Sequence, residues 1–345
     1  MSRRPVSSLT RRAAISGGLA VGLAGLAPAR GEDRSTLVTK SIPKTGERLP
    51  VIGLAAGSFD ERLNNSVDAT RALLNELITH EAKVIDTGVT GGRSEQLIGS
   101  ALARIGARER VFLAAKVAGA DAQSAQASIE LSLQHLRTDR IDLVQLQDLS
   151  AIDTLFPVLQ KLKHAGRARY IGVASMTTQD NDQVMAVMRK HPLDFVQIDY
   201  SMRDRSAAEQ LLPLAEERRI GVIANSPFGG SGFSVYSHTR DRDLPDWVAG
   251  LDIVSWRQFF LKYVVSHPAV TCCIPGILDV QRVDLELQAA RGRLPGATMR
   301  KRMEEFWEAG AAPAAQPTRT GVAASDPTTV VHGRTRQRTT MPLRT

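Results

Sequence analysis

Short apolar runs alternate with amphipathic stretches along the central part of the chain. Most apolar runs are continuous, as expected for parallel strands that are buried on both faces. We predict strands at Leu49–Ala56, Lys83–Thr87, Arg110–Lys116, Ile141–Gln147, Arg169–Ala174, Phe195–Asp199, Gly221–Ser226 and Val270–Pro275. Between them, apolar residues three and four positions apart predict helices. These helices are Asn64–His80, Ser94–Ile105, Ala122–Leu136, Ile152–His164, Met185–Arg189, Ala207–Arg218, Val254–Val265 and Val280–Arg291.

The strands and helices form eight consecutive units over about 245 residues, the usual length of a (β/α)8 or TIM barrel. A doubly wound sheet is the alternative, but it requires a GxGxxG turn after an early strand. The segment Gly53-Leu54-Ala55-Ala56-Gly57 does not provide that turn. The sequence therefore predicts an α/β fold with a single TIM barrel over residues 35–308.

The N-terminal segment, residues 1–29, differs from this body. It combines Arg11-Arg12 with an apolar, glycine-rich run and ends in Ala27-Pro28-Ala29. Paired arginines before such a run resemble a twin-arginine export signal, and small residues suit a signal peptidase. An uncleaved anchor or a chance arginine pair is the alternative. We expect an exported, periplasmic or extracytoplasmic protein that uses the twin-arginine export machinery and keeps no stable membrane span.

The C-terminal segment, residues 309–345, is rich in Ala, Pro, Thr, Gly and Arg and has no strand or helix period. This composition predicts a disordered basic tail. Four arginines in residues 1–29, and five arginines against one aspartate in residues 309–345, account for the net charge of +8. The body is therefore neutral, which does not favour binding of nucleic acid.

Polar residues gather where the predicted strands end, which is where TIM barrels carry their chemistry. They are Asp86, Lys116, Gln147, Asp148, Ser175, Gln197, Asp199, Asn225 and Ser226. An unpaired polar group that faces a core costs about 1–3 kcal/mol. The ring is therefore either mutually bonded, closing the barrel mouth, or arranged around a binding cavity. Asp86 and Lys116, on adjacent strands, are the expected ion pair.

Other chemistries lack their motifs. Cys272 and Cys273 are the only cysteines, and as strand neighbours they should point to opposite faces as free, buried thiols. The seven histidines show no HxH or HExxH spacing, so we expect no histidine metal site. The chain also lacks the GxSxG elbow of a serine hydrolase and the GxxxxGK[ST] phosphate loop.

A series of short matches, in order along the body, resembles the aldo/keto reductase family in its exported twin-arginine branch. The matching stretches are Thr45–Leu54, Val84–Thr87, Ser94-Glu95, Leu136–Leu143, Tyr170–Val173, Phe195–Ile198, Ser226–Gly229 and Ser266–Val270. The resemblance implies that NADP(H) lies across the barrel mouth. It also implies hydride transfer between the nicotinamide and a small-molecule carbonyl or alcohol.

The resemblance also assigns catalytic roles. In the family a Tyr donates the proton, a Lys paired with an Asp lowers the pKa of that Tyr, and a His orients the substrate oxygen. Asp86 and Lys116 match the Asp and the Lys, but Gly91 stands at the Tyr position and Gln147 at the His position. A positioned general acid contributes typically about 10²–10⁴-fold. Carbonyl reduction is therefore expected to be weakened or altered.

The cofactor contacts that the resemblance assigns are Gln197, Ser175, Ser226, Phe228, Gly229, Gly230 and Arg282. Gln197 stands where the family holds the nicotinamide amide, and Arg282 where many members bind the 2′-phosphate. Two differences oppose NADP(H) binding. Gly276-Ile277 replaces the family Lys-Ser, and Glu286 replaces an Asn on the adenine side, where a carboxylate would repel phosphate.

Two hypotheses follow for function. The first is an NADP(H)-dependent oxidoreductase with weakened or altered chemistry, in which Thr90, Tyr200 or an ordered water takes the place of the missing acid. The second is a non-catalytic barrel that serves as an exported binding or scaffold protein.

The export signal is directly testable. Replacing Arg11 and Arg12 by lysine, with Arg3 and Arg4 also replaced, should leave the precursor in the cytoplasm, because the paired guanidinium groups are what the pathway reads. Fractionation followed by immunoblotting measures this. Processed protein outside the cytoplasm in the substituted strain would contradict the twin-arginine signal.

Overall fold

A computed structural model describes residues 36–310, apart from positions 58, 60–62, 89–91, 230–234, 236–238, 240–241 and 278. The predicted signal segment and residues 311–345 of the predicted tail lie outside the described residues. Within the described part, no helix combines the length and the apolar character that a membrane crossing requires.

The centre of the structure is a parallel sheet of eight strands in the order β10-β9-β8-β7-β6-β5-β4-β3. Its strands are β3 (Leu54–Ala55), β4 (Val84–Asp86), β5 (Phe112–Val117), β6 (Ile141–Leu146), β7 (Ala168–Ala174), β8 (Phe195–Asp199), β9 (Gly221–Asn225) and β10 (Val270–Cys273). The segment before β3 then meets β10 through a parallel bridge between Ile52 and Cys273. The Cys273 N–H donates to the Val51 carbonyl, and the Gly53 N–H donates to the Cys273 carbonyl, both at 2.8 Å. This contact closes the sheet into the predicted (β/α)8 barrel.

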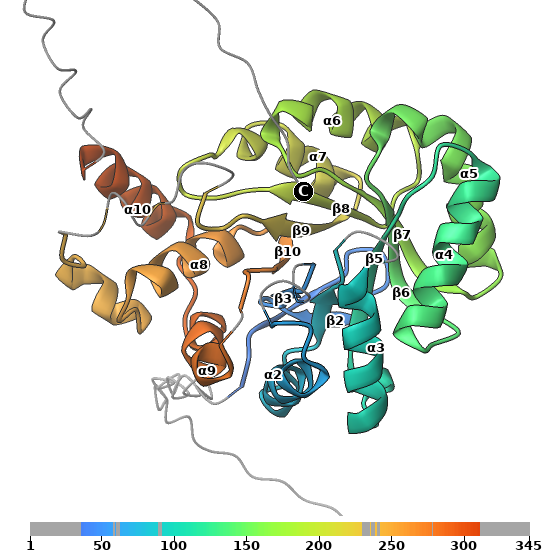
Figure 1. Cartoon of the computed structure of the whole chain (residues 1–345). Coiled ribbons are helices and arrows are strands. Elements are labelled where there is room, and N and C mark those ends of the chain that lie inside the picture. Colours follow the sequence, from blue (N-terminus) through green and yellow to red (C-terminus); the bar gives the residue numbers. More distant parts are fainter. Residues whose placement is uncertain are drawn as a thin grey trace, which may run out of the picture.

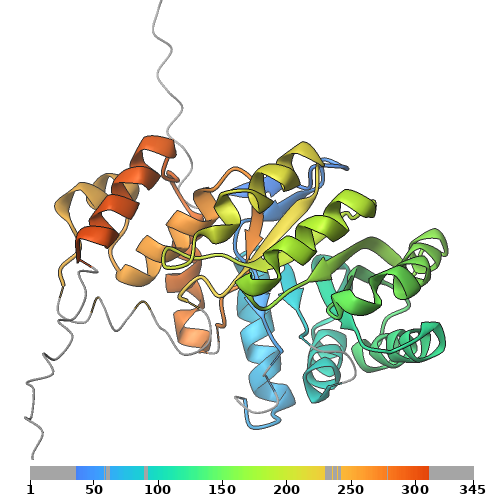
Figure 2. The same cartoon turned by 90° about the horizontal axis from the view of Figure 1, so that it is seen from above.

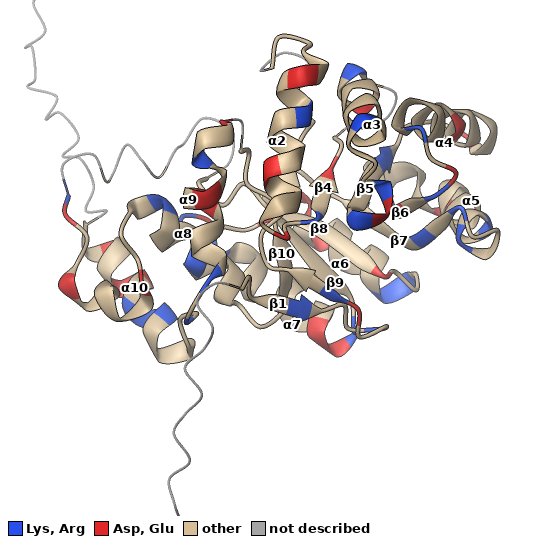
Figure 3. Ribbon diagram, turned by 90° about the horizontal axis from the view of Figure 1, so that it is seen from below, with Lys and Arg blue, Asp and Glu red and all other residues tan. Residues whose placement is uncertain are grey.

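Helices surround the barrel, as Figure 1 shows. They are α2 (Val67–Thr79), α3 (Arg93–Ile105), α4 (Ala122–Leu136), α5 (Ile152–His164), α6 (Asn181–Lys190), α7 (Leu211–Glu217), α8 (Trp256–Ser266), α9 (Val283–Leu287) and α10 (Ala297–Gly310). Seen from above, α10 lies at one side of the molecule (Figure 2), where it packs against α8. From below, basic and acidic residues are interspersed over the helices (Figure 3).

Several predicted elements change their bounds. The predicted strand Leu49–Ala56 is divided between β2 and β3, because Pro50 still pairs with an antiparallel neighbour whereas Leu54 pairs with the parallel barrel. The predicted helices Ala207–Arg218 and Val280–Arg291 are each broken into shorter helical segments. Helix α10 was not predicted, and it extends two residues beyond the predicted barrel end at residue 308.

An antiparallel hairpin, β1 (Thr39–Ser41) with β2 (Arg48–Pro50), covers the N-terminal end of the barrel. Its Ile42 and Leu49 pack with inward-facing barrel residues, among them Phe112, Tyr170 and Phe195. Phe195 leaves no space for a side chain at two glycines that lie against it. A Cβ added at Gly172 would lie 2.3 Å from the Phe195 carbonyl oxygen, and one at Gly221 would lie 2.6 Å from the ring.

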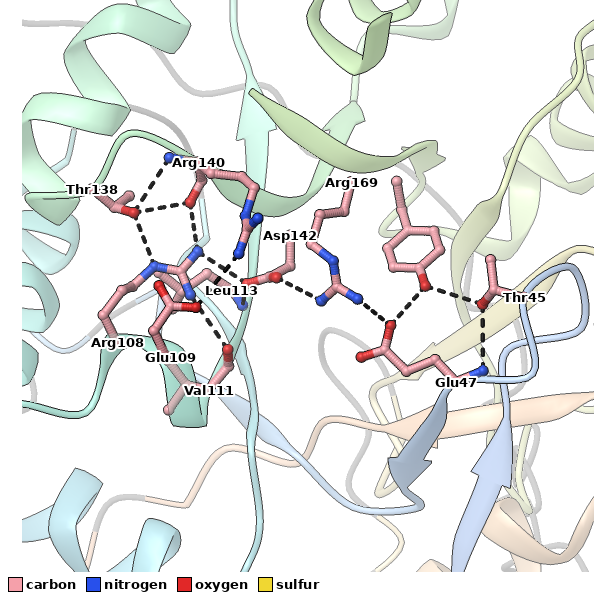
Figure 4. Close-up of polar contacts among 11 residues, drawn as sticks. Thr45, Glu47, Arg108, Glu109, Val111, Leu113, Thr138, Arg140, Asp142 and Arg169 are labelled. Atoms are coloured by element: carbon pink, nitrogen blue, oxygen red, sulfur yellow. Dashed lines mark hydrogen bonds and ion pairs between the residues drawn. The ribbon is translucent and has the colours of Figure 1, made fainter. Parts of the chain in front are cut away.

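A chain of charged groups fixes the hairpin to the strands (Figure 4). Arg169 lies between Asp142 and Glu47: it donates to Asp142 at 2.9 Å and pairs with the Glu47 carboxylate. The Tyr170 hydroxyl also donates to Glu47, at 2.7 Å. Asp142 is buried, and its Oδ2 accepts a further hydrogen bond from the Leu113 N–H at 2.9 Å and lies 3.1 Å from the Arg108 guanidinium.

We predict that Asp142→Ala lowers the free energy of unfolding by about 3 kcal/mol, because it leaves the buried Leu113 N–H without its acceptor and removes a carboxylate partner from two guanidinium groups. Urea denaturation of the mature protein measures this. The matched control is Asp153→Ala, which removes an exposed carboxylate paired with Lys190 and should have a much smaller effect. Equal effects of the two substitutions would contradict the structural role of Asp142.

Candidate active site

The inward-facing residues of the strands are apolar in the lower barrel, towards its N-terminal end, and polar at its mouth, the C-terminal end. Val84, Ala114, Leu143, Phe195 and Ile223 belong to the apolar cluster inside the barrel. Two residues further along the same strands stand Asp86, Lys116, Gln145, Gln197 and Asn225. Because side chains two positions apart share a face, these five polar groups point inward at the C-terminal end. All five are buried.

The predicted ion pair between Asp86 and Lys116 is present. Lys116 Nζ lies 2.6 Å from Asp86 Oδ1 and 2.5 Å from Oδ2. The two residues are 3% and 5% exposed. Asp86 also accepts from the Gly88 N–H at 2.8 Å and from Gln197 Nε2 at 2.7 Å. The carboxylate is therefore held by four hydrogen bonds from three different segments.

Gln197 leaves one buried acceptor without a donor. Its Nε2 donates to Asp86 and to Asn225 Oδ1, the latter at 2.8 Å, so both amide hydrogens are used. Its Oε1 is buried and has no hydrogen-bond partner within the described part of the chain. Since buried polar atoms normally find a partner, this oxygen marks a place where a ligand's N–H group fits.

These residues border a cavity of about 560 Å³, within the range of small-molecule sites. Its polar lining consists of Asp86, Lys116, Gln147, Gln197, Asn225 and Ser226. Apolar contact comes from Met176, Phe228 and Ile274. Asp86 and Lys116 are the charged side chains among the described residues that line it. The polar ring is thus both mutually bonded and open to a cavity.

The loop after β9 forms one wall of the cavity. Ser226 has a φ of 49°, which is uncommon for a residue other than glycine, and its hydroxyl donates to Asp199 Oδ1 at 3.1 Å. Burial raises the pKa of the Asp199 carboxyl, and the Ser226 hydrogen bond partly opposes that increase. The Gly229 N–H donates to the Ser226 carbonyl at 2.9 Å, so this turn already uses one N–H of the predicted pyrophosphate loop.

The remaining predicted site residues differ in whether they reach the cavity. Gln147 is exposed and reaches the cavity rim, as its assigned role requires. Ser175 does not line the cavity as described, because its hydroxyl donates to Asp180 at 2.8 Å. Arg282 is exposed and is likewise not among the described lining residues. Gly91, Thr90 and Gly230 lie outside the described residues.

Two candidate residues can now be placed. Tyr200 is buried away from the cavity lining, where its hydroxyl donates to Tyr263 at 3.3 Å and accepts from Arg300 at 2.7 Å, so it does not replace the missing acid. Glu286 is buried and forms an ion pair with Arg257. Its charge is therefore compensated, contrary to the expectation of a free carboxylate that repels phosphate.

Residues that the sequence reasoning missed also contribute. Arg257 contacts the cavity residue Phe228, since its guanidinium lies 4.2 Å from the centre of that ring, and it also pairs with Glu286. Gln145 lies on β6 in register with Lys116, and its buried Oε1 has no partner in the described part of the chain. Gln145 could have been predicted, because it lies two positions after Leu143 on the same strand and therefore shares its inward face. No local sequence pattern marks Arg257.

Residues 51–307 match the model of the aldo/keto reductase family. The chain belongs to the aldo/keto reductase family. Among curated members, it is 32% identical over 287 residues to the aldo-keto reductase YhdN of Bacillus subtilis, covering 73% of this chain and 84% of that protein. It is 28% identical over 231 residues to the methylglyoxal reductase YeaE of Escherichia coli, covering 64% and 79%.

Solved aldo/keto reductases share the fold. The holo form of AKR11C1 from Bacillus halodurans aligns with a TM-score of 0.63 at 20% identity, covering 78% of this chain and 96% of that one. An aldo-keto reductase from Klebsiella pneumoniae, solved in complex with NADPH, gives the same TM-score at 23% identity, covering 83% and 100%. The predicted (β/α)8 barrel and family are therefore confirmed.

We predict that Lys116→Met destabilises this aldo/keto reductase by about 3–5 kcal/mol, because it leaves the buried Asp86 carboxylate without its counter-charge. The double substitution Asp86→Asn with Lys116→Met should cost less, since it removes both charges. Thermal unfolding of the three proteins provides the comparison. An unchanged melting temperature for Lys116→Met alone would contradict either the pairing or its burial.

Proposed function

We propose that the protein is an NADP(H)-dependent oxidoreductase that acts on a small-molecule carbonyl or alcohol. The observation that carries this proposal is the cavity at the barrel mouth, where Gln197 Oε1 lies unpaired beside the Asp86–Lys116 ion pair. Family membership and the reductases among its relatives support the same reaction class.

The residues fit a nicotinamide dinucleotide. The carboxamide NH₂ of a nicotinamide is a donor that would satisfy Gln197 Oε1, and the Ser226–Gly229 turn lines the same cavity. Relatives from Klebsiella pneumoniae are solved with NADPH and with NADP and acetate. The ion pair of Glu286 with Arg257 removes the main charge objection to phosphate binding.

The bound cofactor would supply a hydride to the carbonyl carbon. The chain's part is to bind, orient and stabilise charge: the carbonyl oxygen gains negative charge as the hydride arrives, and a donor must meet it. Gln147 borders the cavity and stands at the position to which the family resemblance assigns the group that orients the carbonyl oxygen. Lys116, held by Asp86, is the positive charge beside the same cavity.

We propose that the reaction is weakened or altered relative to other members. Gly91 has no proton to donate, and the Gln147 amide donates a hydrogen bond but is not an acid at accessible pH. The same two substitutions favour the second candidate function, a non-catalytic barrel that binds a ligand or partner. We further propose that either activity is exerted outside the cytoplasm, on the basis of the residue 1–29 signal.

Titration of the mature protein with NADPH, followed by intrinsic fluorescence or calorimetry, tests the proposal. We expect saturable binding with one cofactor per chain, and weaker binding of NADP(H) after Gln197→Leu, because the nicotinamide amide loses its acceptor. Absence of NADPH binding by the wild type would refute the oxidoreductase and favour the non-catalytic barrel.

The double variant Gly91→Tyr with Gln147→His separates weakened from lost catalysis. It supplies a phenol five residues beyond Asp86 and the family's orienting imidazole. Reduction of a simple aromatic aldehyde by NADPH should then rise by about 10² or more over the wild type. A variant that binds NADPH without gaining rate would show that the site differs from the family beyond these two positions. A wild type with ordinary reductase activity would contradict the proposed weakening.

A further inference from the structure

The cavity offers few groups that can protonate an oxygen within it. The amide hydrogens of Gln197 are both engaged, and those of Asn225 contact the Ser175 carbonyl and the Met176 sulfur, each at 3.3 Å. The Ser226 hydroxyl donates to Asp199. Among the described lining residues, Lys116 is the one whose side chain is an acid with a hydrogen left to donate.

The count of hydrogens on Lys116 supports this. An ammonium carries three N–H groups. The two short contacts of Nζ go to the two oxygens of one carboxylate, Asp86, and they account for two of those hydrogens. Because Lys116 borders the cavity, its third hydrogen is available to a bound oxygen.

We propose that Lys116 is itself the proton donor of this enzyme, in direct contact with the substrate oxygen, rather than a residue that acts through a tyrosine. This inference rests on the proposed oxidoreductase function. The expected substrates are small carbonyl compounds whose oxygen can lie beside Lys116 in the cavity.

The step balances as a reduction. Bound NADPH would supply the hydride for the new C–H bond at the carbonyl carbon and would itself be oxidised to NADP⁺, while the oxygen gains the proton of one Lys116 N–H bond, which breaks. The neutral amine then takes a proton from water that enters after the alcohol leaves. Alkyl ammonium groups and phenols are acids of comparable strength in water, with ordinary pKa values of about 10.4 and 10, so exchanging one for the other does not change the class of acid.

The surroundings hold the ammonium where the proposal needs it. Asp86 is fixed by Gly88 and Gln197, so Lys116 has a rigid counter-charge on one side and the cavity on the other. The strand beside Lys116 on the other flank, β6, carries the neutral Gln145 opposite it. The charged group that faces Lys116 from the described lining is therefore Asp86.

Lys116→Arg is the decisive variant. A guanidinium keeps the positive charge and the pairing with Asp86, but it does not release a proton at accessible pH. We expect a folded protein with NADPH affinity within about threefold of the wild type. Aldehyde reduction should fall by about 10² or more.

A binding measurement separates proton transfer from charge. Benzoate serves as the probe, because its carboxylate imitates the oxygen that gains charge, and calorimetry is done with NADP⁺ present. Lys116→Arg should bind benzoate within about threefold of the wild type, whereas Asp86→Asn with Lys116→Met should bind at least about tenfold more weakly. The matched control is Lys163→Arg, which alters another lysine–aspartate pair, away from the cavity lining. It should change neither the rate of aldehyde reduction nor the affinity for benzoate.

The outcomes distinguish this inference from the proposed function. A wild type that reduces the aldehyde, with Lys116→Arg equally active, would overturn the assignment of Lys116 and leave the oxidoreductase intact. Unchanged benzoate binding by the double variant would overturn the contact with the substrate oxygen. A wild type that binds NADPH and benzoate without any turnover would overturn both.

Discussion

Strand alternation inside a closed barrel is the constraint on which the rest of this structure depends. Every second residue of eight parallel strands points inward, so each strand must be apolar at its lower inward position and can be polar only near its end. Phe112, Tyr170 and Phe195 fill the lower barrel, and the hairpin residues Ile42 and Leu49 seal it. Because the lower barrel is closed by packing, the polar layer above it does not have to provide the core.

The two ends of the barrel use charge differently. At the N-terminal end, Arg169 joins Asp142 to Glu47 and remains half-buried at the surface, so its charge stays partly hydrated. At the C-terminal end, Asp86 and Lys116 are almost fully buried next to a cavity. The first arrangement ties a hairpin to the strands. The second places a fixed positive charge where a ligand can reach it, which is what stabilising a developing negative charge requires.

Much of the fold was predictable because its signals are local. Helix Ala122–Leu136 has its predicted bounds, and the Asp121 side chain caps its first turn in a reciprocal pair with Ser124. The ion pair of Asp86 with Lys116 was predicted from strand ends alone. What could not be predicted depends on contacts between distant segments: the division of Leu49–Ala56 between two sheets, the packing of α10 on α8, and the pairing of Arg257 with Glu286. No spacing rule encodes such pairs.

A buried ion pair, in a chain that has Gly91 at the position of the family's tyrosine, is informative about what the site does. Desolvation makes buried pairs costly, and well-packed apolar side chains of similar volume often stabilise a protein as well or better. Asp86 is moreover held by backbone that only glycine permits, since Gly88 has a φ of 79° and a Cβ there would lie 2.4 Å from Gly57 Cα. A barrel mouth that only had to be closed would need neither feature. Their joint presence, with Lys116 against the cavity, favours a charge that acts on a ligand over a charge that merely stabilises the fold.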